Sequence, residues 1–328
     1  MIVHSPRQLI SAMPHLIGFH PDNSLVIVAM DDDDLLAINR LDWSSDPVTI
    51  PEVTIGQLRS ARQPSVVLIA YTAAALTQET LIDLAPQMKE FALLDALQVS
   101  EQKWRSLMCS DVACCPVGGH ELENLVGADL DFVVAGSSPF ASRDDLVKRL
   151  ATQTLTDSEA ELRDAALATI VAEFEAALDQ ASDPVVVRAE FLDRSMQIWS
   201  DQSNETDQWQ KLALLNLVVG NIYMRDGLLR QMFDNPELRL PIRTSLIDSV
   251  SMASETEVAP LATVLAGCAW LDGNGALATI ALERALDCDP SYSLARLLDR
   301  AIAHNVPPSV WTDSLAAVSY DECLAGAA

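Results

Sequence analysis

Residues 24–30, Ser-Leu-Val-Ile-Val-Ala-Met, decide the fold class of the first part of the chain. This run is short, almost wholly apolar and rich in β-branched side chains, and four aspartates at 31–34 follow it. A continuous apolar run of this length is typical of a strand that is buried on both faces of a sheet. Residues 66–71, Val-Val-Leu-Ile-Ala-Tyr, and 131–135, Asp-Phe-Val-Val-Ala, have the same character. We therefore predict three buried strands here and weaker strands at 37–41, 96–99 and 103–108.

Helical patterns lie between these strands. Ser5 is placed to cap a helix over Pro6–Leu16, with the proline at its first position. Residues Thr77–Leu94 carry apolar side chains near helical spacing, which predicts a second helix. Alternating strands and helices favour an α/β domain with a partly parallel sheet, and we assign it to residues 1–141.

The pattern changes at residue 142 and predicts helices only. Ser142 with Asp145, and Thr156 with Glu159, have the spacing of capping boxes. Asp183, Asn235 and Asp289 each precede a proline, which is a helix-start pattern. The segment Asn274–Pro290 is similar to the second helix of a tetratricopeptide (TPR) unit, and 291–304 would begin another pair. We predict an all-α, TPR-like domain over 142–328, as a bundle with local repeat character rather than a full solenoid.

The composition restricts the classes of partner. The 328 residues include 47 acidic and 21 basic side chains, for a net charge of −26, and no basic run is present. Binding to nucleic acid needs clustered Lys and Arg, so we expect no nucleic-acid partner. No apolar run approaches the length of a membrane span and the first residues lack the pattern of a signal peptide, so we expect a cytoplasmic chain without a membrane contact.

Three of the six cysteines gather in one segment. Cys109, Cys114, Cys115 and His120 follow a C-x4-C-C-x4-H pattern. Four ligands can hold zinc, but this spacing is at the edge of the usual range and neighbouring side chains tend to diverge. A disulfide and a reactive thiol are further alternatives. We favour structural thiols that point inward from a tight turn after a strand, and expect no metal and no cofactor.

A second group of candidates lies at predicted strand ends. Gly136, Ser137 and Ser138 follow the strand at 131–135, and Tyr71 ends another strand. Ligands of open α/β sheets gather at the carboxyl ends of strands, which makes a crevice there a candidate site. Arg105 would either pair with an acidic side chain or hold an anionic ligand near the cysteines. His15 and His20 are more simply explained as turn histidines, because no nucleophile stands at a recognised spacing from them.

The chain resembles the actinobacterial and actinophage family known as domain of unknown function 4192. The resemblance rests on Trp-Arg-Ser at 104–106 with Cys-Cys-Pro at 114–116, on the segment Pro14–Val26, and on three segments between Leu271 and Leu298. It departs at Leu107, where the family has an aromatic residue, and at Val112, where a proline is common. The resemblance implies an intracellular two-part protein and supplies no reaction and no catalytic residues.

No catalytic signature is present in the sequence. We therefore expect a non-catalytic adaptor with an unidentified protein partner. The alternative is an enzyme or small-ligand binder that uses the crevice at the strand ends. Convergence of Tyr71, Arg105, Cys109, Cys115 and Ser137 on one pocket would favour the alternative, and scattering would favour the adaptor.

Overall fold

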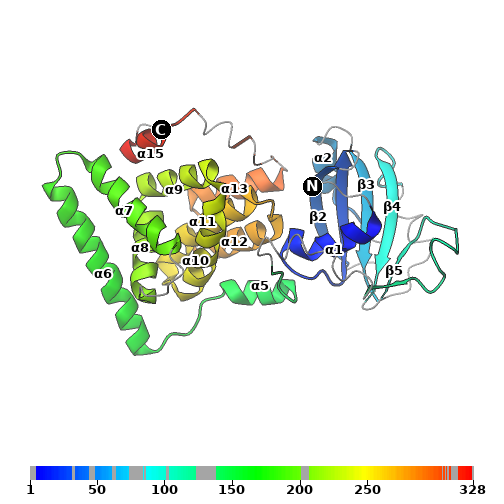
Figure 1. Ribbon diagram of the computed structural model, residues 1–328, viewed down its shortest axis with the longest axis horizontal. Coiled ribbons are helices and arrows are strands. Elements are labelled where there is room, and N and C mark those ends of the chain that lie inside the picture. Colours follow the sequence, from blue (N-terminus) through cyan, green and yellow to red (C-terminus); the bar gives the residue numbers. More distant parts are fainter. Residues whose placement is uncertain are drawn as a thin grey trace. The chain divides into compact units, whose positions relative to one another are not determined.

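The computed structural model describes two compact units, Met1–Asp145 and Leu146–Ala328 (Figure 1). Each is considered by itself below. The structure describes residues 5–31, 34–43, 49–60, 64–73, 84, 86–100, 103–122, 138–200, 207–304, 306, 308, 310, 311 and 317–326.

The first unit is built on a mixed six-stranded sheet with strand order β2-β1-β3-β4-β5-β6. Only β3 and β4 are parallel, and the other neighbours are antiparallel. This confirms the predicted α/β class with a partly parallel sheet. The strands are β1 (Ser24–Asp31), β2 (Asp34–Asp42), β3 (Ser65–Tyr71), β4 (Ala92–Val99), β5 (Lys103–Ser106) and β6 (His120–Glu121).

Strand β1 is buried on both faces, as its apolar run predicts. Leu25, Ile27 and Ala29 belong to one hydrophobic core, which also holds Ile55 and Leu58 of α2 (Glu52–Ser60). Side chains at the alternate positions belong to the opposite core, together with Leu9, Ile10 and Met13 of α1 (Pro6–Ile17). The period-2 alternation of a strand thus gives each helix its own face of the sheet.

Helix α1 begins and ends where the sequence indicates. The Ser5 side chain accepts a hydrogen bond from the Gln8 amide at 3.3 Å, and Pro6 occupies the first helical position. Gly18 ends the helix at a φ of 84°, and its N–H donates to Pro14 O at 2.8 Å. A glycine there avoids the steric cost that a Cβ has in the left-handed region.

The predicted helix Thr77–Leu94 is wrong at its carboxyl end. Residues 86–90 form turns and Ala92 begins β4, while 77–83 lie outside the described residues. Parallel pairing of Ala92 with Ser65 overrides the helical spacing of the apolar side chains. Met88 and Phe91, two of the apolar side chains of that pattern, are nevertheless buried in a hydrophobic core. The predicted strand at 131–135 also lies outside the described residues.

The second unit is helical throughout its described residues, as predicted. Its central helix α11 is buried almost continuously from Val258 to Trp270, as expected of a helix that is apolar on all sides. Small side chains of α12, Ala278, Ala281 and Ala285, are fully buried and allow a close approach. The TPR-like detail stays a prediction. The helices are α5 (Arg143–Leu150), α6 (Asp157–Gln180), α7 (Pro184–Ser200), α8 (Gln208–Gly220), α9 (Ile222–Asp234), η2 (Pro236–Leu238), α10 (Arg239–Met252), α11 (Glu255–Leu271), α12 (Gly275–Cys288), α13 (Ser293–Ala303) and α15 (Tyr320–Ala325).

The capping predictions hold at several helix starts. Thr156 and Glu159 form a capping box at α6, and the Asp145 amide donates to Ser142 Oγ at 3.1 Å. Pro236 begins the 3-10 helix η2, without a side-chain cap from Asn235. The prediction at Asp289 is wrong, because Pro290 lies in a turn and α13 begins three residues later.

No single helix among the described residues is both long and apolar enough to span a membrane. Helices α8 and α9 have that length and composition only when taken together, and they are bent by 99° at their break.

Candidate functional site

A cavity of about 480 Å³ opens in the first unit at the carboxyl ends of β3 and β4. Tyr71, Thr72 and Ala73 line it from the end of β3, and Val99 and Ser100 line it from the end of β4. Because these two strands are parallel, their carboxyl ends meet at one edge of the sheet, where α/β folds commonly bind ligands. The remaining wall comes from α1, the turn after it and the residue that follows β6: Ile10, Ser11, Pro14, His15, His20, Pro21, Asp22 and Leu122.

The wall of this cavity combines apolar surface with hydrogen-bonding groups. Two imidazoles, one carboxylate, one phenol and three hydroxyl side chains share it with aliphatic and proline side chains. No lysine or arginine is among the described lining residues. Ligand sites of this size are mostly apolar with a few placed polar groups. The arrangement suits an uncharged molecule better than a phosphate, which is usually held by Arg or Lys.

The turn after α1 positions His20 and Asp22. The His20 amide donates to Phe140 O at 2.9 Å, and the Phe140 amide donates to Gly18 O at 2.9 Å. The Asp22 carboxylate accepts from the Asn23 amide at 2.8 Å, and Asn23 has a φ of 40°. Backbone pairing with Phe140 on one side and a local hydrogen bond at Asp22 on the other therefore hold this part of the wall.

Tyr71 is the most unusual residue of the cavity. The residue is 7% exposed, and its hydroxyl is buried without a hydrogen-bond partner among the described residues. Burial raises the pKa of the phenol well above its ordinary value, so the hydroxyl stays protonated. An unpaired buried hydroxyl costs free energy, and such a group is a marker for a missing partner.

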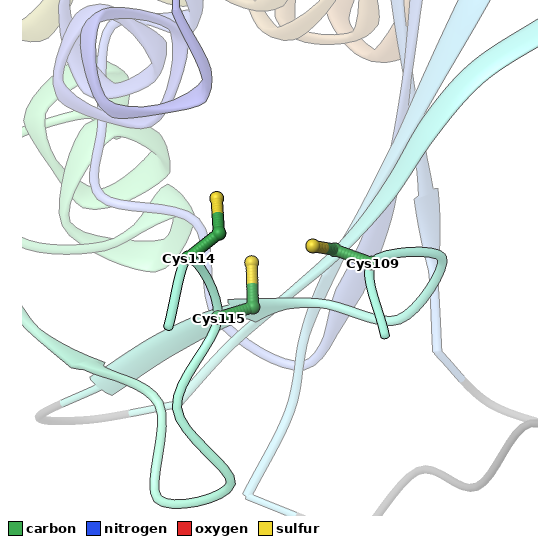
Figure 2. Close-up of side chains that lie close together, drawn as sticks. All are labelled: Cys109, Cys114 and Cys115. Atoms are coloured by element: carbon green, nitrogen blue, oxygen red, sulfur yellow. The ribbon is translucent and has the colours of Figure 1, made fainter. Parts of the chain in front are cut away.

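The three clustered cysteines form a second, separate candidate site (Figure 2). Their Sγ atoms all lie within 4.8 Å of one another, and the figure shows the three thiols directed into a shared space. The Asp111 carbonyl accepts from the amides of Cys114 at 3.1 Å and Cys115 at 2.7 Å. This turn points the two neighbouring side chains the same way, whereas they would diverge in a strand.

The expectation that these cysteines point inward is wrong. Cys114 is exposed, and Cys109 and Cys115 are half-buried. The predicted turn itself is present, although β5 ends at Ser106, before Cys109. The loop therefore brings the three thiols together at the surface and does not place them in a core.

The electrostatics of the cluster bear on the reactive-thiol alternative. Burial and a hydrogen bond with the Cys109 side chain raise the pKa of the Cys115 thiol to about 11. Reactive cysteines usually have a lowered pKa, because the thiolate is the nucleophile. Cys115 is therefore protonated at neutral pH when no ion is bound, which disfavours it as an activated nucleophile.

Trp104 and Arg105 lie on opposite faces of β5, as predicted. Trp104 is buried in the core beneath α1, and its indole stacks on the His120 ring. Arg105 donates from Nε and Nη2 to Gln98 Oε1, at 3.2 and 3.0 Å. One partner of Arg105 is thus the side-chain amide of Gln98.

The predicted site residues do not all meet. Tyr71 lines the cavity, whereas Arg105 and the cysteines are absent from its wall, and Ser138 is an exposed residue outside it. Gly136 and Ser137 lie outside the described residues. Among the described residues the candidates scatter, which is the outcome that favours the adaptor. The structure nevertheless places a cavity at the strand ends that the alternative requires.

His15 and His20, for which the sequence predicts no more than a place in a turn, both line the cavity with Asp22. The turn prediction is wrong for His15, which lies in the last turn of α1. The segment that could have identified them is Pro14–Val26, which already carries part of the family resemblance.

Comparison with known proteins identifies the family. The family model "Domain of unknown function (DUF4192)" matches residues 6–309, nearly the whole chain. The chain belongs to the DUF4192 family. Neither a curated protein nor a solved structure matches it. The DUF4192 match covers both the sheet of the first unit and most helices of the second.

Proposed function

We propose that the first unit of this DUF4192 protein binds a small uncharged molecule in the cavity at the ends of β3 and β4. The observation that carries the proposal is the buried, unpartnered Tyr71 hydroxyl in the wall of a 480 Å³ cavity. The hydroxyl exposes almost no surface, so a ligand with a hydrogen-bond acceptor reaches it by displacing the wall beside Tyr71, and the new hydrogen bond removes the cost of its burial.

The chemistry of the wall restricts the ligand class. The two imidazoles and the proline rings offer flat, partly apolar surface, and Ser11, Thr72 and Asp22 offer polar contacts. A volume near 480 Å³ is at the small end of ligand pockets. A molecule of about nucleoside size, with an apolar face and a hydrogen-bonding edge, fits these features.

Ligand-observed NMR with the full chain tests this proposal. The probes are uncharged nucleosides, nucleobases and monosaccharides, each compared with its phosphorylated form. We expect one uncharged class to bind with a Kd below about 1 mM, a free energy near 4 kcal/mol, and its phosphate to bind more weakly. Tyr71→Phe should weaken that binding about 5- to 10-fold, since it removes one hydrogen bond.

A cavity-filling variant provides the matched control. Ser11→Phe places an aromatic ring into the cavity and should abolish binding. Leu94→Phe adds an aromatic ring at an exposed position of β4 outside the cavity and should leave binding unchanged. Failure of every uncharged probe to bind, or equal binding by Ser11→Phe, would refute the proposal.

The adaptor role stays a second proposal for the helical unit. It is supported by the helix pair α11–α12, joined through Gly273 at a φ of 75°, which is the type of pair that repeat proteins stack. We propose a cytoplasmic protein partner, with no membrane contact and no nucleic acid. Capture of host proteins by the chain tests this proposal. Wild type is compared with Leu297→Asp, which places a charge at an exposed site of α13 on the surface of the second unit. Submicromolar binding of DNA or RNA at physiological salt would contradict it.

A further inference from the structure

The cysteine loop has the geometry of a soft-metal site. The three Sγ atoms of Cys109, Cys114 and Cys115 are within 4.8 Å of one another. Zinc–sulfur bonds of about 2.3 Å in tetrahedral array place thiolates about 3.8 Å apart. A contraction of about 1 Å or less would bring the thiols to this spacing, which rotation of cysteine side chains can supply.

These thiols have no role in the packing of a core, since Cys114 is exposed and Cys109 and Cys115 are only half-buried. Buried cysteines behave as small hydrophobes, and Cys268 in the second unit is such a residue. The three loop cysteines instead belong to neither core of the first unit. Three free thiols converging at a surface therefore need another explanation.

Hydrogen bonds hold both arms of the loop in place. On the first arm, Ser106 Oγ donates to Asp95 Oδ1 at 2.6 Å and accepts from the Cys109 amide at 3.1 Å. On the second arm, the Asp111 carbonyl holds the amides of Cys114 and Cys115. Because the arms are positioned by their own contacts, less conformational entropy is lost when an ion binds.

We propose that Cys109, Cys114 and Cys115 bind one zinc ion as three thiolates and leave its fourth position open. Thiolates select zinc and other soft ions, whereas calcium and magnesium prefer oxygen ligands. A [4Fe–4S] cluster would hold each thiolate on a different iron and separate the sulfurs further. Each thiol loses its proton on binding, so uptake releases protons to solvent.

The open position follows from the ligand set. No His, Asp or Glu among the described residues joins the three thiols within the same radius. His120, the fourth residue of the sequence pattern, is stacked on Trp104. Zinc sites with three protein ligands commonly complete their tetrahedron with water or an exogenous ligand. The site therefore has room for a small thiol or imidazole from solution.

Metal analysis of the reduced full chain tests the proposal. We expect about one zinc per chain by elemental mass spectrometry, in keeping with a stoichiometric thiolate site. Cobalt(II) should produce thiolate-to-metal charge-transfer absorption, and the single variants Cys109→Ser, Cys114→Ser and Cys115→Ser should each lower its intensity by about a third. Zinc affinity should fall more than about 100-fold, which exceeds the loss on changing a residue behind the ligands. Added imidazole should shift the cobalt spectrum of the wild type.

Cys288→Ser is the matched control, because Cys288 is also half-buried but lies in the second unit. This variant should retain zinc. Circular dichroism confirms the fold of each variant, and exposed Cys114 is the position least sensitive to substitution. Zinc far below one per chain after reduction and reloading, unchanged affinity in the three variants, or stoichiometric copper in place of zinc would each overturn the proposal.

Discussion

The imidazole of His120 stacks on the indole of Trp104, with ring centroids 4.5 Å apart and ring planes 24° apart. The two residues are directly paired across β5 and β6, the two strands that flank the cysteine loop. The Trp104 ring lies in the core of the sheet, and the His120 ring packs on it where the cysteine loop ends. The stack therefore links the stability of the sheet edge to the conformation of the thiols.

Replacement of His120 by alanine should loosen this loop. An aromatic pair contributes roughly 0.5–1.5 kcal/mol beyond its buried area, so we expect His120→Ala to lower the free energy of unfolding by about 1 kcal/mol. Amide hydrogen exchange in residues 107–119 should accelerate. His304→Ala, at an exposed site of the second unit, serves as the control and should change neither measurement.

The two glycines that close the loop should respond differently to alanine. Gly119 has a φ of 74°, and a Cβ there would lie 2.9 Å from the Trp104 carbonyl oxygen. A Cβ added at Gly118 would lie in open space. We expect Gly119→Ala to destabilise the first unit by about 1–3 kcal/mol and Gly118→Ala to change it little. Urea denaturation of both variants decides this, and equal stabilities would contradict the strain argument.

Thiol reagents should discriminate sharply among the six cysteines. Cys114 is exposed, whereas Cys268 and Cys323 are buried. Burial is the main cause that raises the pKa of Cys268, to about 12, which suppresses its thiolate further. We expect alkylation of the metal-free native protein to modify Cys114 first and to leave Cys268 and Cys323 unmodified until urea unfolds the chain. Mass spectrometry of peptides after timed labelling gives the order, and early labelling of Cys268 would refute it.

Removal of the Tyr71 hydroxyl should stabilise the ligand-free protein. The group is buried without a partner, so Tyr71→Phe deletes a desolvation cost and loses no hydrogen bond that the described residues show. We expect a gain of about 1 kcal/mol in the free energy of unfolding. Tyr320→Phe is a comparable change in the second unit, because the Tyr320 hydroxyl is also buried and has no hydrogen-bond partner in the described part of the chain. Destabilisation by Tyr71→Phe would mean that the hydroxyl has a partner.

The sequence predicts the parts of this fold that depend on local pattern. The apolar run at Ser24–Met30 requires a strand covered on both faces, and Ser5 with Pro6 requires a helix start. The segment at Ala92–Leu94 was predicted wrongly because its conformation depends on pairing with β3, more than twenty residues away. Without knowledge of that pairing, the apolar pattern of this segment fits both a helix and a half-buried strand.

In the candidate sites, too, the sequence predicts only the features that depend on local pattern. Tyr71 could be predicted because it ends a buried strand, and strand ends commonly carry ligands. The convergence of Cys114 with Cys115 could not, because it depends on hydrogen bonds of both amides to the Asp111 carbonyl. Nor could the contribution of His20, whose position depends on backbone pairing with Phe140 far along the chain.

The stability of helix α6 should depend on pH through one capping carboxylate. Glu159 accepts hydrogen bonds from the Thr156 amide at 2.8 Å and the Thr156 hydroxyl at 2.7 Å. The amide first, and the hydroxyl second, lower the pKa of Glu159 below its ordinary value of 4.5. A carboxyl group whose pKa is lower in the folded state stabilises that state above its unfolded pKa. This contribution is lost as the pH falls through the folded pKa.

Comparison of Glu159→Gln with wild type isolates this effect. We expect the wild type to be more stable near pH 7, and the difference to shrink as the pH falls below about 4.5. The difference should be small, because the group is exposed and solvent screens its interactions. Glu175→Gln, at an exposed position near the other end of α6, should show no such dependence. Urea denaturation across this pH range measures both variants. A difference for Glu159→Gln that grows at low pH would have the opposite sign and would exclude the capping carboxylate as its cause.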